Sequence, residues 1–227
     1  MEEGHLNLQD AAITAQKYFF YLVFRAKQLH PYNLSPVYRR RARMIIGETL
    51  KSRKRRLREG FFEKYCQGKG IDIGCGPYDR IMPDVDGWDK EDGDAALMAG
   101  IPDETYDYAY SSHCLEHIID QSRALQNWLR ILKKGGFLII SVPHRDLYEK
   151  KERLPSQWNK DHKRFYLPDK DSPPDTVSFR RVVEEAIGKE AEWIYLKICK
   201  EGWVPLPDHV HPRGEYQIEA VLRKSES

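Results

Sequence analysis

The sequence has no long apolar run. Its longest strongly apolar stretch, residues 18–24, is far shorter than the ~20 residues that a membrane-spanning helix needs. No apolar leader with a small-residue cleavage site precedes this stretch, so a secretory signal is not expected. These absences argue against a membrane protein, and we expect a cytoplasmic location without membrane contact.

Cysteine is scarce, and repeats and low-complexity tracts are absent. The 227 residues include four cysteines, whose spacing shows neither the close pairs of a zinc site nor the density of a disulfide scaffold. The content of 41% hydrophobic and 32% charged residues is ordinary for one globular domain with a sizeable core. We therefore expect four reduced thiols: Cys66, Cys75, Cys114 and Cys199.

The net charge of +2 hides an uneven distribution. Residues 1–69 hold 15 lysines and arginines against 6 acidic residues, a net charge of +9, which leaves −7 for the rest. The densest basic run begins at Arg39 and ends at Arg58, and such a run can bind nucleic acid. It lacks the interleaved aromatic residues that stack on bases, and apolar residues recur in it at near-helical spacing. We interpret the run as an amphipathic helix with solvated basic side chains, its apolar positions being Met44, Ile45, Ile46, Leu50 and Leu57.

The first third of the chain differs in pattern from the rest. Two helices are expected there, over residues 8–29 and 37–66, separated by a segment whose two prolines interrupt the helical pattern. Together they predict a helical N-terminal extension or lid, residues 1–69.

From residue 70 onward, short apolar strands alternate with helices, which is typical of an α/β fold with a largely parallel sheet. A polar, proline-rich segment over residues 144–174 resembles a long insertion. The expected strands are 70–74, 85–88, 106–111, 137–142, 193–199 and 216–223, and the expected helices are 121–132 and 177–187.

A glycine turn follows the first expected strand, in the sequence IDIGCGP at residues 71–77. An open α/β sheet admits a nucleotide-like ligand at such a turn, and Gly74 and Gly76 would let the backbone approach it. The third glycine of a dinucleotide fingerprint is replaced by Asp79, whose carboxylate would repel a pyrophosphate. S-adenosylmethionine, a positively charged nucleoside without phosphate, escapes that objection.

Residues 70–144 resemble the class I S-adenosylmethionine-dependent methyltransferase family, in its small-molecule branch. The matching motifs are IDIGCGP, GWDKEDGDA after the second strand, IPDETYDYAYSSHCLEHI at 101–118 and LRILKKGGFLIISVPH at 129–144. The resemblance implies a doubly wound, mostly parallel, seven-stranded Rossmann-like sheet over residues 70–227, with S-adenosylmethionine as cofactor. It also implies methyl transfer to an oxygen or nitrogen of a small acceptor, with a sugar or glycan precursor as the leading class.

The resemblance further implies the cofactor residues. Asp72 would anchor the methionine amine, Asp89 would accept hydrogen bonds from the ribose hydroxyls, and Gly74 and Gly76 would line the cofactor backbone. Two departures stand out: the linker over residues 77–84 is too short for the usual helix, and apolar residues replace the acidic residue that often contacts adenine. Leu97 and Met98 would pack the adenine, and Ser111, Ser112 and His113 would lie beside the transferred methyl.

The pentapeptide HCLEH at residues 113–117 also matches H-x-x-E-H, a zinc motif of inverted zinc peptidases. In those enzymes the motif lies within a long helix, whereas here it directly follows a strand. We therefore expect Glu116 and His117 to cap and orient a loop, and no metal.

Proton removal from an acceptor usually needs a base, and histidine titrates in the useful range. His162, within DHKRFYLPD, is the first candidate, followed by His144 and His113. Further acceptor-side candidates are Asp146, Asp161 and His209, with Trp158, Phe165, Tyr166, Trp203 and His211 as walls of a pocket.

Two other functions are compatible with these patterns. One is an RNA or protein methyltransferase that uses the basic run from Arg39 to Arg58, and the other is a non-catalytic module that retains the cofactor pocket. Arg55 or Arg58 is a further candidate, as a partner of the cofactor carboxylate. The patterns predict neither the acceptor atom, nor the oligomeric state, nor whether a metal assists.

Overall fold

The computed structural model describes residues 48–76, 81–82 and 84–226. The chain divides into two compact units, Met1–Ile45 and Ile46–Ser227, and the description concerns the second. The helix expected over residues 8–29, the beginning of the helix expected over 37–66, and Asp79 lie outside the described residues.

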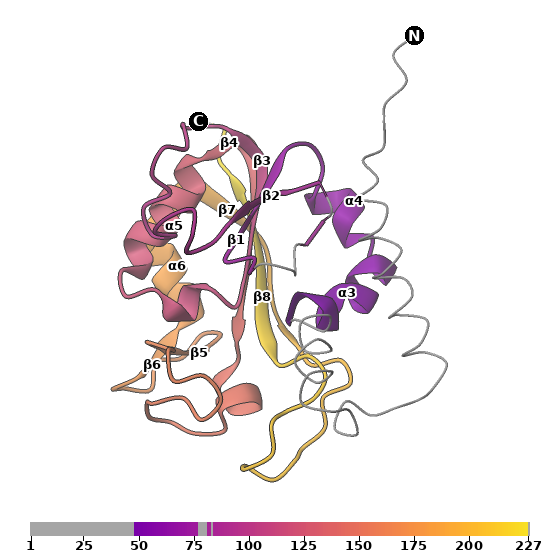
Figure 1. The fold of residues 1–227 in the computed structure, drawn as a ribbon, viewed down its shortest axis with the longest axis vertical. Coiled ribbons are helices and arrows are strands. Elements are labelled where there is room, and N and C mark those ends of the chain that lie inside the picture. The colour runs from indigo at the N-terminus through magenta and orange to yellow at the C-terminus, as the bar shows by residue number, and fades with distance from the viewer. Residues whose placement is uncertain (1–47, 77–80, 83, 227) are drawn as a thin grey trace. The chain divides into compact units, whose positions relative to one another are not determined.

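The second unit is built on a six-stranded sheet with the order β2-β1-β3-β4-β8-β7 (Figure 1). Its first four members pair in parallel, whereas β8 runs antiparallel to both of its neighbours. The expectation of a doubly wound, mostly parallel sheet is confirmed, although the described residues form six strands rather than seven. The strands are β1 (Gly70–Ile73), β2 (Asp86–Trp88), β3 (Tyr106–Ser112), β4 (Leu132–Pro143), β7 (Ala191–Cys199) and β8 (Gln217–Lys224).

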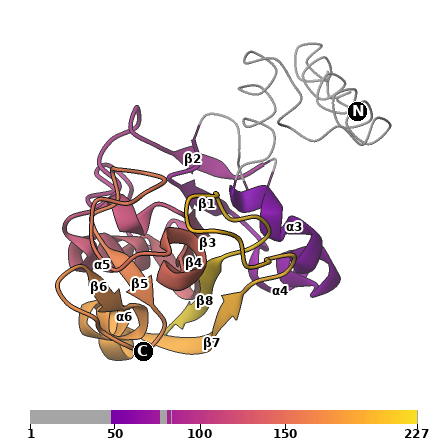
Figure 2. The same cartoon turned by 90° about the horizontal axis from the view of Figure 1, so that it is seen from below.

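Helices cover both faces of this sheet (Figure 2). On one face lie α5 (Gln121–Arg130) and α6 (Phe179–Ile187). Each begins at a residue whose side chain accepts a hydrogen bond from the first turn, Asp120 for α5 and Ser178 for α6. Both helices agree with the sequence pattern to within two residues at either end.

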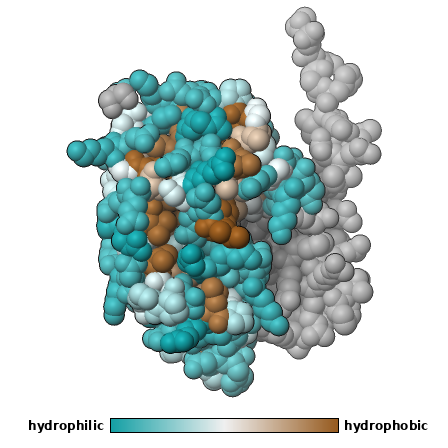
Figure 3. Space-filling view, turned by 90° about the vertical axis from the view of Figure 1, so that its left-hand side faces the viewer, coloured by the Kyte–Doolittle hydropathy of each residue, from teal (hydrophilic) through white to brown (hydrophobic). Residues whose placement is uncertain are grey.

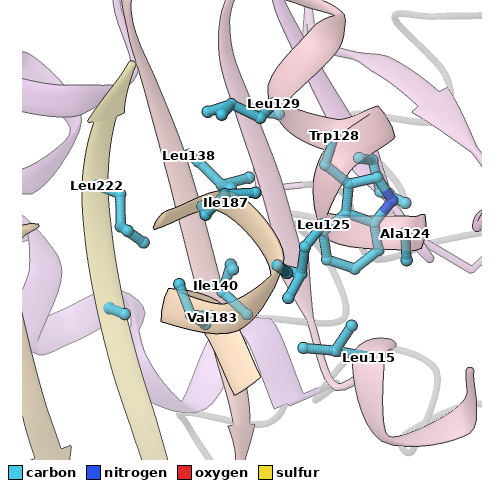
Figure 4. Packing of buried hydrophobic residues seen from close by; sticks show 14 of the residues in the cluster. Leu115, Ala124, Leu125, Trp128, Leu129, Leu138, Ile140, Val183, Ile187 and Leu222 are labelled. Atoms are coloured by element: carbon cyan, nitrogen blue, oxygen red, sulfur yellow. The ribbon is translucent and has the colours of Figure 1, made fainter. Parts of the chain in front are cut away.

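The face under α5 and α6 holds the larger apolar core (Figure 4). Side chains of a strand alternate between the two faces of a sheet, so every second residue of β4 and β8 points toward these helices. Leu138, Ile140 and Leu222 are the strand residues labelled in Figure 4, and they pack against Leu125 and Trp128 of α5 within one buried cluster.

The opposite face is covered by α3 (Glu48–Arg58) and α4 (Phe61–Tyr65). One helix was expected to continue through residue 66, but Gly60 adopts φ 62°, a left-handed conformation that ends α3 and starts a new helix. Phe61 and Phe62 then pack against Tyr108 and Tyr110 of β3 in a second, smaller cluster.

The carboxyl ends of β1 to β4 meet at one edge of the sheet, where the long connections gather toward the bottom of Figure 1. The segment expected as a polar insertion is more regular than its composition indicates. It contains η3 (Arg145–Glu149) and β5 (Phe165–Leu167), which pairs in parallel with β6 (Thr176–Ser178). Two single turns, η2 (Leu115–His117) and η4 (Gly188–Glu190), complete the elements.

The surface seen from the α5 and α6 side is mainly hydrophilic, with small and separate hydrophobic areas (Figure 3). Among the helices that the structure describes, none has the length and apolar character to cross a bilayer.

Candidate active site

The glycine turn after β1 lies at the carboxyl edge and faces the loop after β3. Gly74 adopts φ 74° and its N–H donates to the carbonyl of Trp88 at 2.8 Å. A Cβ on Gly74 would lie 2.6 Å from the Cβ of Cys114, so only glycine fits there. Among the described residues, no atom lies within 4 Å of the position that a Cβ on Gly76, with φ 60°, would take. The described part of the chain therefore leaves space beside the Gly76 backbone for a ligand.

Asp89 follows β2 directly and is fixed against this turn. Its Oδ2 accepts a hydrogen bond from the N–H of Gly76 at 2.6 Å, and its Oδ1 accepts from the N–H of Lys90 at 2.7 Å. The neighbouring Trp88 has a buried indole Nε1 without a hydrogen-bond partner among the described residues. A carboxylate at the mouth of the turn and the space beside Gly76 fit a nucleoside with ribose hydroxyls.

Asp72 lies in the middle of β1 and is 2% exposed. Its Oδ2 accepts from the N–H of Ile81 at 2.6 Å, so this carboxylate holds the chain that continues from the glycine turn. Of the short linker expected over residues 77–84, the structure describes residues 81, 82 and 84, which form bends and a turn.

The adenine side contains the two expected apolar residues in unequal positions. Met98 is fully buried in the core and adopts φ 46°, whereas Leu97 is partly exposed. Asp94 caps the turn that contains them, with its Oδ1 accepting from the N–H of Ala96 at 2.8 Å. Of the two residues, only Leu97 is exposed enough to contact a ligand, whereas Met98 belongs to the core.

Ser111 and Ser112 end β3, and His113 follows in a left-handed conformation with φ 55°. The Nε2 of His113 lies 3.2 Å from Oε1 of Gln217, at the start of β8. Because that oxygen can only accept, His113 Nε2 is the donor. Cys114, the next residue, packs closely against Gly74, so the loop that carries His113 adjoins the glycine turn.

His162 is nearly buried, with 5% of its surface exposed, and its Nδ1 lies 2.6 Å from Oε1 of Glu149. The other oxygen of Glu149 accepts from the hydroxyl of Ser156 at 2.6 Å. His117 packs edge-on against His162, with ring centroids 4.8 Å apart, and its Nδ1 lies 3.0 Å from Asp161. Burial lowers the pKa of His117, and the neighbouring His162 lowers it further.

His144, the second candidate base, follows β4. Its Nδ1 accepts from the N–H of Asp146 at 3.2 Å, so the ring caps the start of η3. Burial lowers the pKa of His144, which keeps the ring neutral. The exposed His209 makes no hydrogen bond that the structure records with these groups.

An aromatic cluster lies beside His113 and His162. Tyr148 is central: its ring centroid lies 4.8 Å from that of Tyr216, 5.8 Å from His162 and 5.6 Å from His211. Trp158 packs edge-on against His211 at 5.0 Å.

The expected pocket walls therefore divide into two groups. Trp158 and His211 join the cluster, and Trp203 donates its indole N–H to the carbonyl of Leu147 at 3.1 Å. Phe165 and Tyr166 are buried in β5, where Tyr166 packs against Phe179 of the core. Tyr148 and Tyr216 were missed, because no sequence spacing links residues so far apart.

The end of the basic run is buried in ion pairs. Arg56 is fully buried and donates to Oε2 of Glu219 and to the hydroxyl of Tyr110, both at 2.6 Å. Arg55 donates to Glu215 and Glu219 at 2.8 and 2.9 Å. The expectation of solvated basic side chains is wrong for these two arginines, because carboxylates from the segment before β8 and from β8 itself compensate the buried charges.

The apolar side of this helix is also different from the expected one. Leu57 is 54% exposed, although the pattern predicted it on the buried side. Arg58 pairs with Glu201 near the surface. Arg55 and Arg58 are thus both held by protein carboxylates, which leaves the suggested pairing with a cofactor carboxylate unsupported.

All four cysteines are free thiols, as expected. Burial raises the pKa of Cys66, Cys114 and Cys199 to about 12. These three thiols are protonated at neutral pH and are poor nucleophiles.

A family model described as a methyltransferase domain matches residues 22–185 of the chain. The match covers well over half of the sequence, and the chain belongs to this family. The family and the fold identify the chain as a methyltransferase domain of the class I, S-adenosylmethionine-dependent type.

Individual relatives are more distant. The chain is 36% identical to ajmaline N-methyltransferase of Rauvolfia serpentina over 66 residues, which are 29% of this chain and 22% of that protein. It thus matches less than a quarter of that relative's length.

Solved structures share the fold. One, concerned with the conversion of a disulfide bond into a thioacetal group during echinomycin biosynthesis, has a TM-score of 0.50 at 17% identity and covers 74% of this chain and 81% of its own. An S-adenosylmethionine-dependent methyltransferase from Methanosarcina mazei has a TM-score of 0.45 at 12% identity, with 74% of this chain and 98% of its own covered.

Proposed function

We propose that the protein transfers the methyl group of S-adenosylmethionine to an oxygen or nitrogen of a small acceptor. The observation that carries this proposal is the Asp89 carboxylate held at the N–H of Gly76, with Cys114, the neighbour of His113, packed against Gly74 of the same turn. The two carboxylate oxygens of Asp89 can accept hydrogen bonds from ribose hydroxyls at one end of the site. The imidazole of His113 supplies a polar side chain at the other end.

The cofactor supplies a methyl group on a positively charged sulfur. Asp89 would bind the ribose, Asp72 would hold the turn and favour the methionine amine, and Gly74 and Gly76 would let the backbone approach. Leu97 would contact the adenine with Met98 behind it. Ser111, Ser112 and His113 would border the methyl group.

The acceptor is proposed to lie against Trp158 and His211, the partly exposed members of the aromatic cluster, which also contains the buried Tyr148 and Tyr216. Aromatic rings pack well against the apolar faces of sugars and other ring compounds, and a sugar-linked acceptor is our leading class. The likeness to ajmaline N-methyltransferase supports including amines among the acceptors to be tested.

His113 is the base candidate that the geometry favours. His162 is enclosed and its Nδ1 contacts Glu149, and His144 caps η3, whereas His113 precedes Cys114, which packs against the glycine turn. With Nε2 donating to Gln217, a proton taken from the acceptor would go to Nδ1, which lies 3.6 Å from the buried carboxylate of Glu116.

An RNA acceptor is less favoured than a small one. Arg55, Arg56 and Arg58 supply three charges of the basic run, and all three pair with carboxylates of the protein. A phosphate backbone would have to compete with those partners. If RNA were the acceptor, its affinity would fall steeply with salt, with a log–log slope near −0.7 per phosphate contacted.

Calorimetry with S-adenosylmethionine tests the cofactor site. Asp89→Ala is expected to weaken binding about tenfold or more, which is about 1.4 kcal/mol, because two acceptor oxygens are lost. The matched control is Asp84→Ala, an exposed carboxylate before the other end of β2, which should leave the affinity unchanged. Equal affinities in both variants would contradict the ribose role.

Turnover tests the catalytic part. Release of S-adenosylhomocysteine with any member of a panel of sugars, amines and phenols would support methyl transfer, and His113→Asn should lower the rate at saturating cofactor. Cofactor binding without turnover across the panel would favour the alternative of a non-catalytic module.

A further inference from the structure

Three side chains of metal-ligand type converge at the carboxyl edge, outside the proposed cofactor contacts. Glu116 and His117 come from η2, and His162 comes from the long segment after β4. One ligand atom from each lies within 4.8 Å of the other two. Glu116 is fully buried and His162 is 5% exposed.

The two imidazoles are oriented in the same way. His162 places Nδ1 2.6 Å from Glu149, and His117 places Nδ1 3.0 Å from Asp161. An Nδ1–H that donates to a carboxylate leaves the lone pair of a neutral ring on Nε2. A histidine that binds a metal through one ring nitrogen usually donates the N–H of its other ring nitrogen to a carboxylate or carbonyl.

The buried carboxylate of Glu116 lies near His162 and His113, at distances beyond hydrogen bonding. Its Oε1 lies 3.9 Å from Nε2 of His162 and 3.6 Å from Nδ1 of His113. With metal–ligand bonds of about 2.0–2.2 Å, neighbouring ligand atoms of a tetrahedral site lie on the order of 3.4 Å apart. Reaching that spacing from the present positions requires each ligand atom to move by roughly 1 Å or less. The three groups are thus close enough for small side-chain rotations to complete a site.

We propose that Glu116, His117 and His162 bind a divalent transition-metal ion of the zinc type, with one coordination position open. Two imidazoles and one carboxylate are a known ligand set of catalytic zinc sites, and imidazole favours zinc over magnesium or calcium. The sequence pattern led us to expect no metal. The site also differs from the zinc motif in HCLEH, because His113 is replaced as a ligand by His162, 45 residues further along the chain than His117.

The ion would lie next to His113 and the aromatic cluster, through the contacts of His162 with Tyr148 and of Glu116 with His113. A metal ion lowers the pKa of a hydroxyl that occupies its open position. This role would favour acceptors with a hydroxyl group, and it rests on the proposed function. The proposal that the three residues bind a metal ion is independent of that function.

The test is titration of the chelator-treated full chain with Zn²⁺ in a calorimeter, together with Co²⁺ absorption. We expect one ion per chain and visible Co²⁺ bands of nitrogen and oxygen ligands without thiolate bands. Glu116→Gln and His162→Gln should each weaken Zn²⁺ binding by at least about 100-fold. Glu149→Gln, which removes the support of His162, should weaken it about tenfold.

His209→Gln is the matched control, because this histidine is exposed and outside the cluster. It should leave the affinity unchanged. Absence of Zn²⁺ binding by the wild-type chain would overturn the proposal, as would thiolate bands with Co²⁺ or binding that survives both Glu116→Gln and His162→Gln. The Co²⁺ spectrum of the wild-type chain decides the question even if a variant fails to fold.

The same samples separate this proposal from the proposed function. Asp89→Ala should bind Zn²⁺ normally while binding S-adenosylmethionine weakly. A chain that turns over without binding Zn²⁺ refutes the metal site alone, whereas one that binds Zn²⁺ but no S-adenosylmethionine refutes the proposed function alone.

Discussion

The two faces of the sheet are held to their helices by different forces. Under α5 and α6 the contact is hydrocarbon, with Leu125 and Trp128 fully buried against β4 and β8. Under α3 the contact includes Arg55 and Arg56, which reach Glu215 and Glu219. Truncating a buried apolar side chain should therefore destabilise the first face strongly. Removing one charge of a buried ion pair should destabilise the second face strongly.

The ionic face is stable only because each buried charge is matched. Arg56 also donates to the hydroxyl of Ser141 at 3.1 Å, besides Glu219 and Tyr110. Burial alone would lower the pKa of Arg55, but its hydrogen bonds to Glu215 and Glu219 raise that pKa above the ordinary value. The helix is therefore oriented by specific pairs rather than by an apolar stripe.

Removing Glu219 should have the largest effect. Glu219→Leu leaves the fully buried Arg56 without a carboxylate, and we expect a loss of about 4 kcal/mol in the free energy of unfolding, measured with urea. The double variant Glu219→Leu/Arg56→Met removes both charges and should recover most of that loss. If the single and double variants were equally unstable, the cost would come from packing rather than from charge.

Leu125→Ala tests the hydrocarbon face. Leu125 is fully buried in α5, so truncation should cost about 3 kcal/mol in the same measurement. Because no ionisable group is touched, the loss should be the same at pH 7 and pH 4. A strongly pH-dependent loss would contradict the division between the two faces.

Acid should weaken the ionic face selectively. Burial raises the pKa of Glu219, but Arg56 and Arg55 outweigh that effect and lower the pKa from the usual 4.5 to about 2. The folded state therefore gains stability above pH 4.5, and this gain, about 3 kcal/mol, is lost as the pH falls through 4.5 toward 2. The stability difference between wild type and Glu219→Gln should shrink over that interval, and a constant difference would refute the assignment.

Leu57→Lys should have the smallest effect. Leu57 is 54% exposed, so the substitution is expected to change the free energy of unfolding by less than about 0.5 kcal/mol. A loss of 2 kcal/mol or more would contradict the exposed position of Leu57. It would support the amphipathic orientation that the sequence pattern predicted for α3.

The sequence predicted the apolar face well and the ionic face poorly, for a physical reason. Periodic hydrophobicity identifies elements such as α5, whose burial follows from its own residues. Arg56 is buried because of Glu219, which is distant in sequence, and no local pattern contains that pairing. The same holds for the site: the turn at Gly74 and the position of Asp89 were predictable from adjacent motifs, whereas the meeting of His162 with His117 depends on the folded long segment.

The position of β8 has a consequence for synthesis on the ribosome. This strand lies between β4 and β7, and its Glu219 reaches back to α3. A nascent chain that ends before Gln217 leaves β4 and β7 unjoined, and the guanidinium groups of α3 have none of their carboxylate partners from β8. The sheet can close, and the arginines of α3 can enter the interior, only after β8, which follows the other described strands along the chain, has emerged.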